Sequence, residues 1–105
     1  MIKVAIKKVD ICGTCLKGEL DISYDRLVEI FGTPNLDNGD CYKTDANWGG
    51  YVDNEVFTIY NYKTGKNYNG ADGLETKDIR DWHIGGRNYS VFEKISEYID
   101  NFPAK

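Results

Sequence analysis

The feature that most constrains the fold is a predicted β-hairpin in the middle of the chain. Residues 56–60 are dense in β-branched and aromatic side chains, a composition typical of strands. In residues 42–48 every second side chain is charged or an amide, which is the period of a strand with one buried face. Asp53-Asn54 lies between the two segments and suits a tight turn. The pattern therefore predicts two adjacent antiparallel strands.

Three further extended segments are predicted. Residues 2–11 begin with alternating apolar and mostly basic side chains, again the period of a half-buried strand. Residues 19–22 form a second short piece, and residues 81–84 form a last strand that the pair Gly85-Gly86 is expected to end. Residues 67–78 are rich in polar residues and glycine and are predicted to be loop-like.

One helix is predicted after Asp21 or Ser23, since either residue can serve as its N-cap. Its apolar residues recur at positions i, i+3, i+4 and i+7, which lie on one face of a helix. These residues are Tyr24, Leu27, Val28 and Phe31. Gly32 suits the C-terminal end of the helix, and Pro34 prevents its continuation.

A second helix is predicted near the end of the chain. Ser90 and Glu93 match a capping box, in which the two side chains satisfy each other's free backbone donors. An apolar stripe follows, formed by Phe92, Ile95, Ile99 and Phe102, and Pro103 ends the helix.

The order of these elements predicts the fold class. Residues 1–105 should form one α+β domain, in which a four- to five-stranded, mostly antiparallel sheet carries two helices packed on one face. The chain contains only two prolines, so linkers between domains are not expected.

Charge and hydropathy exclude two classes of partner. The net charge is −4, from 17 acidic and 13 basic residues, whereas non-specific binding to nucleic acid depends on a basic face. No apolar segment approaches the ~20 residues that a membrane span needs. The first residues, MIKVAIKKVD, lack the apolar centre of a signal peptide. We therefore expect a cytoplasmic protein that binds neither membrane nor nucleic acid non-specifically.

The cysteines raise the question of a metal. Cys12, Cys15 and Cys41 give an odd count, which fits a reducing compartment better than a disulfide framework. Together with His83 they could supply the four ligands of a zinc site. A single C-x-x-C motif is weak evidence for zinc, and the residues after Cys15 resemble a strand rather than the helix of a redox motif. No metal or cofactor is therefore predicted, although convergence of these four residues stays open.

His83 is the only histidine of the chain. In a strand, Trp82 and Ile84 would point to one face and His83 to the other. The neighbouring Asp81 is expected to point away from His83, and no nucleophile lies close in sequence, so no catalytic residue is predicted. The alternative is a hydrolase or metal-dependent enzyme that uses His83 with Asp81 or Asp45.

Two other segments could bind a ligand or a partner. Gly85-Gly86-Arg87 precedes a capped helix, so these residues, with His83, could bind an anion such as a phosphate. Residues 60–70 combine three tyrosines with asparagines and lysines, a composition that suits a protein interface. The contact residues predicted there are Tyr62, Lys63, Lys66, Asn67 and Tyr68. A plain hairpin with half-buried tyrosines is the alternative.

Several motifs together resemble a set of small, mostly uncharacterised bacteriophage accessory proteins. They are SYDRLV at 23–28, FGTP at 31–34, YKTDANW at 42–48, TIYNYK at 58–63 and WHIGG at 82–86. The resemblance spans nearly the whole chain, does not depend on the cysteines, and carries no established reaction. It implies a phage protein that inhibits host immunity, either by blocking an effector protein or by sequestering a nucleotide signal.

These observations predict a non-enzymatic phage protein that binds a host protein stoichiometrically and counters a bacterial defence system in the host cytoplasm. The first alternative is a protein that sequesters a nucleotide-like ligand, with Arg87 and the two glycines holding a phosphate. The second is a His-dependent hydrolase or a zinc protein. An exposed edge strand could also pair with a second copy of the chain to form a homo-oligomer.

Overall fold

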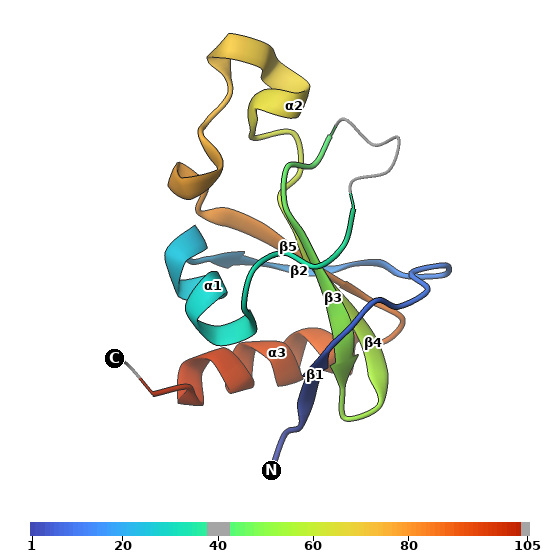
Figure 1. Cartoon of the computed structure of the whole chain (residues 1–105). Coiled ribbons are helices and arrows are strands. Elements are labelled where there is room, and N and C mark those ends of the chain that lie inside the picture. The colour runs from blue at the N-terminus through green and yellow to red at the C-terminus, as the bar shows by residue number, and fades with distance from the viewer. Residues whose placement is uncertain (38–42, 104–105) are drawn as a thin grey trace.

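Five antiparallel strands form one sheet in the order β1-β3-β4-β5-β2. The computed structural model describes residues 1–37 and 43–103, and Figure 1 shows α1 and α3 on one side of the sheet. The strands are β1 (Val4–Ile6), β2 (Cys15–Asp21), β3 (Asn47–Val52), β4 (Glu55–Tyr60) and β5 (Asp81–Gly86). The predicted α+β fold, with its antiparallel sheet and its helices on one face, is confirmed.

The predicted hairpin is present, but its first strand was placed too early. Asp53 and Asn54 have φ angles of 48° and 69°, as in the tight turn that matches the twist of a hairpin. Val52 therefore pairs with Glu55, and β3 runs from Asn47 to Val52, so that it shares only its first two residues with the predicted strand at 42–48. The prediction missed this strand because its centre, Gly49-Gly50, has low strand propensity. The prediction for residues 42–48 lies partly outside the described residues.

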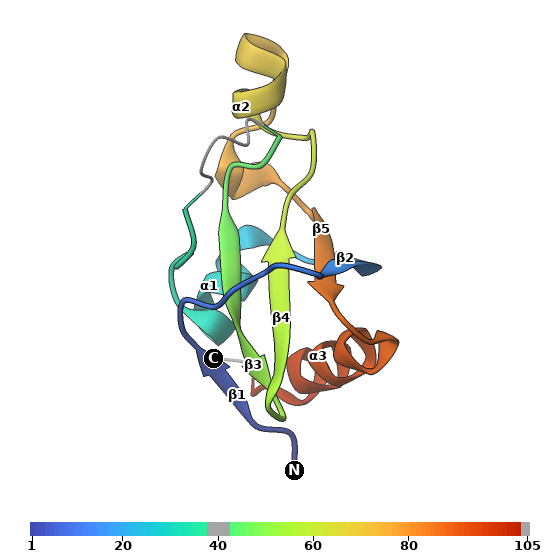
Figure 2. The same ribbon diagram turned by 90° about the vertical axis from the view of Figure 1, so that its right-hand side faces the viewer.

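The connection between β1 and β2 crosses the whole sheet. β1 pairs with β3 at one edge, and β2 pairs with β5 at the other, so residues 7–14 run over β3 and β4 on the face away from α3 (Figure 2). Lys7 donates a backbone hydrogen bond to Gly49 O at 3.2 Å. Arg87 donates from its guanidinium to Cys12 O at 2.9 Å. The face opposite the helices is therefore partly covered by this connection.

α1 (Tyr24–Phe31) begins as predicted, because Ser23 Oγ accepts a hydrogen bond from Arg26 N at 3.1 Å. α3 (Tyr89–Asn101) begins differently. Its N-cap is Asn88, which makes no side-chain capping bond. The predicted capping box is wrong, since Ser90 Oγ instead donates to Glu55 Oε2 at 3.3 Å.

The core lies between the helices and the sheet. Trp48 and Trp82 are fully buried and meet edge to face, with ring centroids 5.4 Å apart. Each indole N–H donates to a backbone carbonyl, Trp48 to Gly32 O at 2.8 Å and Trp82 to Ile79 O at 3.1 Å. Both polar groups are thus satisfied inside the core. The apolar residues of both helices pack against the same cluster, among them Leu27, Phe31, Val91, Ile95 and Ile99.

Between β4 and β5 the chain leaves the sheet and forms a projecting arm, residues 61–79 (Figure 1). This arm contains α2 (Lys66–Asn69) and two 3-10 turns, Gly70–Asp72 and Thr76–Asp78. The predicted loop at 67–78 is therefore a succession of single turns, too short to show the period of a helix in the sequence. Among the described residues, no helix is long and apolar enough to cross a bilayer.

Glu55 holds the start of α3 to the hairpin, and this contact gives the stability a predictable pH dependence. Hydrogen bonds from Asn88 and Lys94 lower the pKa of the Glu55 carboxyl below its ordinary value of 4.5. The ionised carboxylate therefore stabilises the fold above the unfolded-state pKa. This contribution is lost as the pH falls through the lower pKa of the folded state.

We expect Glu55→Gln to lower the Tm at neutral pH, and the difference from the wild type to shrink as the pH falls below 4.5. Thermal unfolding followed by circular dichroism across this range measures the effect. The control is Glu93→Gln, which removes an exposed negative charge from α3, the helix that Glu55 contacts. A constant Tm difference at all pH values would contradict the assignment.

Candidate functional site

The base of the arm is fixed by one buried amide. The side chain of Asn61, at 0% exposure, accepts hydrogen bonds at Oδ1 from Asp45 N at 2.7 Å and from Ala46 N at 3.1 Å. Its Nδ2 donates to Asp45 Oδ1 at 2.8 Å and to Thr64 Oγ1 at 3.3 Å. Asn61 therefore joins the start of the arm to the segment that precedes β3. No sequence pattern marks Asn61 as a site residue, because an asparagine in a tyrosine-rich turn gives no indication of burial.

Asn67 provides a second attachment of the arm. Its backbone N–H donates to Asp45 Oδ2 at 3.1 Å, and its Nδ2 donates to Thr44 O at 2.9 Å. Asp45, which the enzyme alternative would pair with His83, is thus engaged by Asn61 and Asn67. Of the five predicted contact residues, Asn67 therefore acts at least in part as an anchor of the arm.

Three of the predicted contact residues lie together on the surface, and we name them the Tyr–Lys–Tyr cluster: Tyr62, Lys63 and Tyr68. The two tyrosines are 39% and 40% exposed. The ammonium nitrogen of Lys63 lies 5.3 Å from the centroid of each ring, within the range of a cation–π contact. The remaining predicted contact residue, Lys66, forms an ion pair with Glu75 on the same arm. The structure thus brings together Tyr62, Lys63 and Tyr68.

His83 lies beside this cluster, on the face of β5 away from the helices. Its ring stacks on Tyr62 with centroids 5.6 Å apart and contacts Tyr60 at 5.4 Å. Only 11% of its side chain is exposed, and Nε2 lies 2.9 Å from Glu19 Oε1. The residues near His83 in sequence predicted no catalytic partner, and the carboxylate beside it comes from a different strand. Glu19 is the neighbour of His83 across the β2–β5 pair. A local sequence motif cannot predict this contact, because the two residues lie in distant segments.

Asp81 also lies near His83, contrary to the sequence expectation. Residues two apart on a strand share a face, and ligand atoms of Glu19, Asp81 and His83 lie within 4.8 Å of one another. These three groups could hold a divalent cation, although a structural zinc site takes four ligands. Cys12 and Cys15 are exposed free thiols and do not belong to this group. Cys41, the third cysteine of the predicted set, lies outside the described residues.

The predicted anion-binding residues do not form a glycine turn. Gly85 and Gly86 are buried within β5 and do not end the strand before them. The strand alternation places His83 and Gly85 on one face and Gly86 on the other. The Arg87 guanidinium donates to Asp10 O at 3.2 Å and to Cys12 O at 2.9 Å. Arg87 therefore holds the β1–β2 connection, and phosphate binding at this position stays a prediction.

Comparison with known proteins adds no family. The chain matches no protein-family model, and it has no significant match among curated proteins. The function is therefore inferred from the side chains of this chain and from the placement that the fold gives them.

Proposed function

We propose that this protein is a non-enzymatic binding protein that attaches to a partner protein through the Tyr–Lys–Tyr cluster. The observation that carries the proposal is that two tyrosines, 39% and 40% exposed, lie on an arm anchored by the hydrogen bonds of the buried Asn61. Tyrosine offers a large contact area and loses little rotamer freedom on binding. An arm that is already ordered avoids part of the entropy cost of association.

The charge of the cluster indicates the chemistry of the partner. Lys63 lies over both rings, so the surface presents one positive charge among apolar and hydroxyl groups. A partner with a carboxylate beside an apolar patch would complement it. The resemblance to small phage proteins leads us to propose a host protein of a bacterial defence system as this partner, bound stoichiometrically in the host cytoplasm.

The double variant Tyr62→Ala/Tyr68→Ala tests the proposed surface. We expect it to lower the affinity for the partner roughly thirtyfold, because each tyrosine truncation removes about 1 kcal/mol of binding energy. The partner is first captured from a lysate of the bacterial host with the wild-type protein. Its affinity for the wild type and the variant is then measured by isothermal titration calorimetry.

Tyr89→Ala is the matched control, since Tyr89 is an exposed tyrosine with a lysine over its ring, Lys17, but lies at the start of α3. This variant should bind like the wild type. The Tm of each variant shows whether the fold is intact, which matters because Tyr62 also stacks on His83. A folded double variant that keeps wild-type affinity would show that the partner binds elsewhere.

A further inference from the structure

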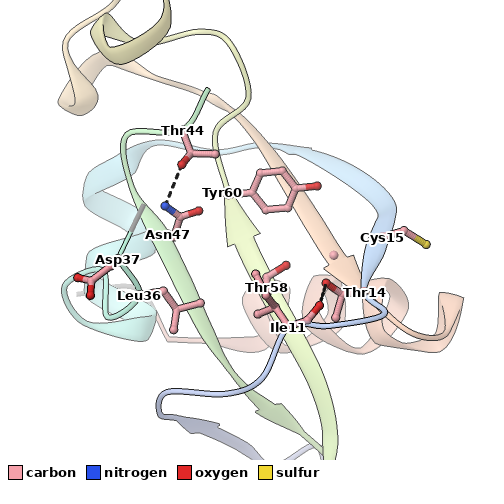
Figure 3. A pocket seen from close by; sticks show the side chains of 10 residues that line it. Ile11, Thr14, Cys15, Leu36, Asp37, Thr44, Asn47, Thr58 and Tyr60 are labelled. Carbon is pink, nitrogen blue, oxygen red and sulfur yellow. Dashed lines mark hydrogen bonds between the residues drawn. The ribbon is translucent and has the colours of Figure 1, made fainter. Parts of the chain in front are cut away.

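A cavity of about 260 Å³ lies on the sheet face that the helices leave uncovered. Figure 3 shows it between the β1–β2 connection, the segment after α1 and the central strands. We name it the open-face cavity, and the residues that define it here are Ile11, Leu36, Asp37, Thr58, Tyr60 and Gly85. It involves none of the three residues of the Tyr–Lys–Tyr cluster, so it is separate from the proposed partner surface.

The floor of the cavity contains a hydroxyl without a protein partner. Thr58 is only 6% exposed, and its side chain makes no hydrogen bond in the described chain. Thr58 lines the cavity, and its hydroxyl is not among the fully buried atoms that lack a partner, so a ligand in the cavity can form a hydrogen bond with it. Gly85 leaves room for this hydroxyl to pack against its backbone, because a Cβ at that position would lie 2.4 Å from Thr58 Oγ1.

The walls of the cavity are held in place. Leu36 N donates to Asn47 O at 3.1 Å, and the side chain of Asn35 exchanges two hydrogen bonds with Gly49, at 3.0 and 2.9 Å. On the other side, Arg87 holds the connection that carries Ile11. Two aliphatic walls therefore stand at fixed positions on the sheet, as expected of a preformed ligand site.

Charge and size restrict the ligand. No lysine or arginine among the described residues lines the cavity, and the one charged group there is the exposed carboxylate of Asp37. A phosphate would therefore lack a counter-charge, whereas a hydrogen-bond donor would find an acceptor. The volume falls below the roughly 300–1,000 Å³ of pockets for drug-sized molecules. A compound of one or two fused rings matches this size.

Tyr60 adds a hydrogen-bond donor at the rim. A phenol with the ordinary pKa of 10.0 is protonated at neutral pH, and burial raises the pKa of Tyr60 further. Its ring lies close to the backbone at Gly85, since a Cβ there would be 3.5 Å from the Tyr60 ring. The sulfur of Cys15 points away from the cavity (Figure 3), whereas Thr44 and Asn47 add polar side chains to its lining.

We propose that the open-face cavity binds an uncharged heterocyclic base of nucleobase size that carries an amino group. The ring lies beside Thr58, between the aliphatic walls formed by Ile11 and Leu36. Thr58 Oγ1 forms a hydrogen bond with a ring heteroatom, and the Asp37 carboxylate accepts a hydrogen bond from the exocyclic amino group.

Titration of the ¹⁵N-labelled full chain with adenine, adenosine, AMP and uracil tests this proposal by NMR. We expect adenine and adenosine to shift the amide signals of Ile11, Thr58 and Gly85 saturably, with a Kd of about 1 mM or tighter. AMP should bind roughly fivefold more weakly than adenosine because its phosphate has no cation to pair with. Uracil, which has no amino group, should also bind more weakly than adenine.

Two variants assign the contacts. Thr58→Val keeps the side-chain shape and should weaken adenine binding roughly fivefold, as expected for one lost hydrogen bond. Thr33→Val, at an exposed position outside the cavity, should have no effect. Asp37→Asn changes only the rim and should reduce the preference for adenine over uracil.

Ligand binding in the open-face cavity is tested separately from partner binding at the Tyr–Lys–Tyr cluster, so either proposal can fail without the other. The absence of saturable shifts with all four compounds would overturn the ligand proposal, as would AMP binding more tightly than adenosine. Equal adenine affinity in the wild type and a folded Thr58→Val variant would also overturn it. The Tyr62→Ala/Tyr68→Ala variant should still bind adenine, because the cavity does not include these residues.

Discussion

Asn61→Leu is expected to lower the free energy of unfolding by about 4 kcal/mol, a large part of the total stability of a domain of this size. The replacement removes the acceptor of two backbone N–H groups, those of Asp45 and Ala46, and the donor to the Asp45 carboxylate. Each polar group left buried without a partner costs about 1–3 kcal/mol. Leucine is close in size to asparagine, so the loss is mainly of hydrogen bonds.

Urea denaturation followed by tryptophan fluorescence measures this loss. Asn101→Leu, at an exposed position near the end of α3, is the matched control and should change the stability by less than about 0.5 kcal/mol. Amide hydrogen exchange should show that protection is lost first in the arm, residues 61–79, because Asn61 attaches it. A variant as stable as the control would mean that the hydrogen bonds of Asn61 contribute little.

Asn61 also links stability to the proposed function. The Tyr–Lys–Tyr cluster lies on the arm that Asn61 anchors, so a loosened arm would present the same side chains without a fixed arrangement. At a temperature where Asn61→Leu is still folded, its partner affinity should therefore fall although no contact residue has changed.

Gly50→Ala is expected to destabilise the protein by roughly 3 kcal/mol and to displace β1 from the sheet. A Cβ at residue 50 would lie 2.1 Å from the carbonyl oxygen of Ala5 in β1. The next residue of β1, Ile6, pairs directly with Gly50 of β3. This obstacle is backbone, so a side-chain rotation cannot relieve it. Overpacking inside a fold typically costs about 1–3 kcal/mol, and the loss of β1 pairing adds to that cost.

The adjacent glycine provides an internal comparison. A Cβ at residue 49 would meet Leu36 Cδ1 at 2.5 Å, the flexible end of a side chain that can move. Gly49→Ala should therefore destabilise the protein less than Gly50→Ala, as measured by chemical denaturation. In Gly50→Ala, the amides of Val4–Ile6 should exchange faster with solvent than in the wild type. If Gly49→Ala proved the more damaging variant, the close approach of β1 would be contradicted.

The sequence by itself determined the elements whose signals are local. The stripe of Tyr24, Leu27, Val28 and Phe31 repeats with the period of a helix, and α1 begins at the predicted cap, Ser23. The turn at Asp53-Asn54 is also local, because both residues tolerate a positive φ. These patterns suffice to predict an α+β domain, since each apolar face must be buried against another.

The tertiary structure decided what depends on the pairing of distant segments. The neighbour of His83 is Glu19 because β2 pairs with β5, and residues 7–14 cross the sheet because β1 lies at the opposite edge. That crossing engages Arg87 and forms one wall of the open-face cavity. Strand periodicity shows which side chains share a face of one strand, but it carries no information about which strand lies next to it. Side-chain contacts that depend on strand order, such as that between Glu19 and His83, could therefore be identified only from the tertiary structure.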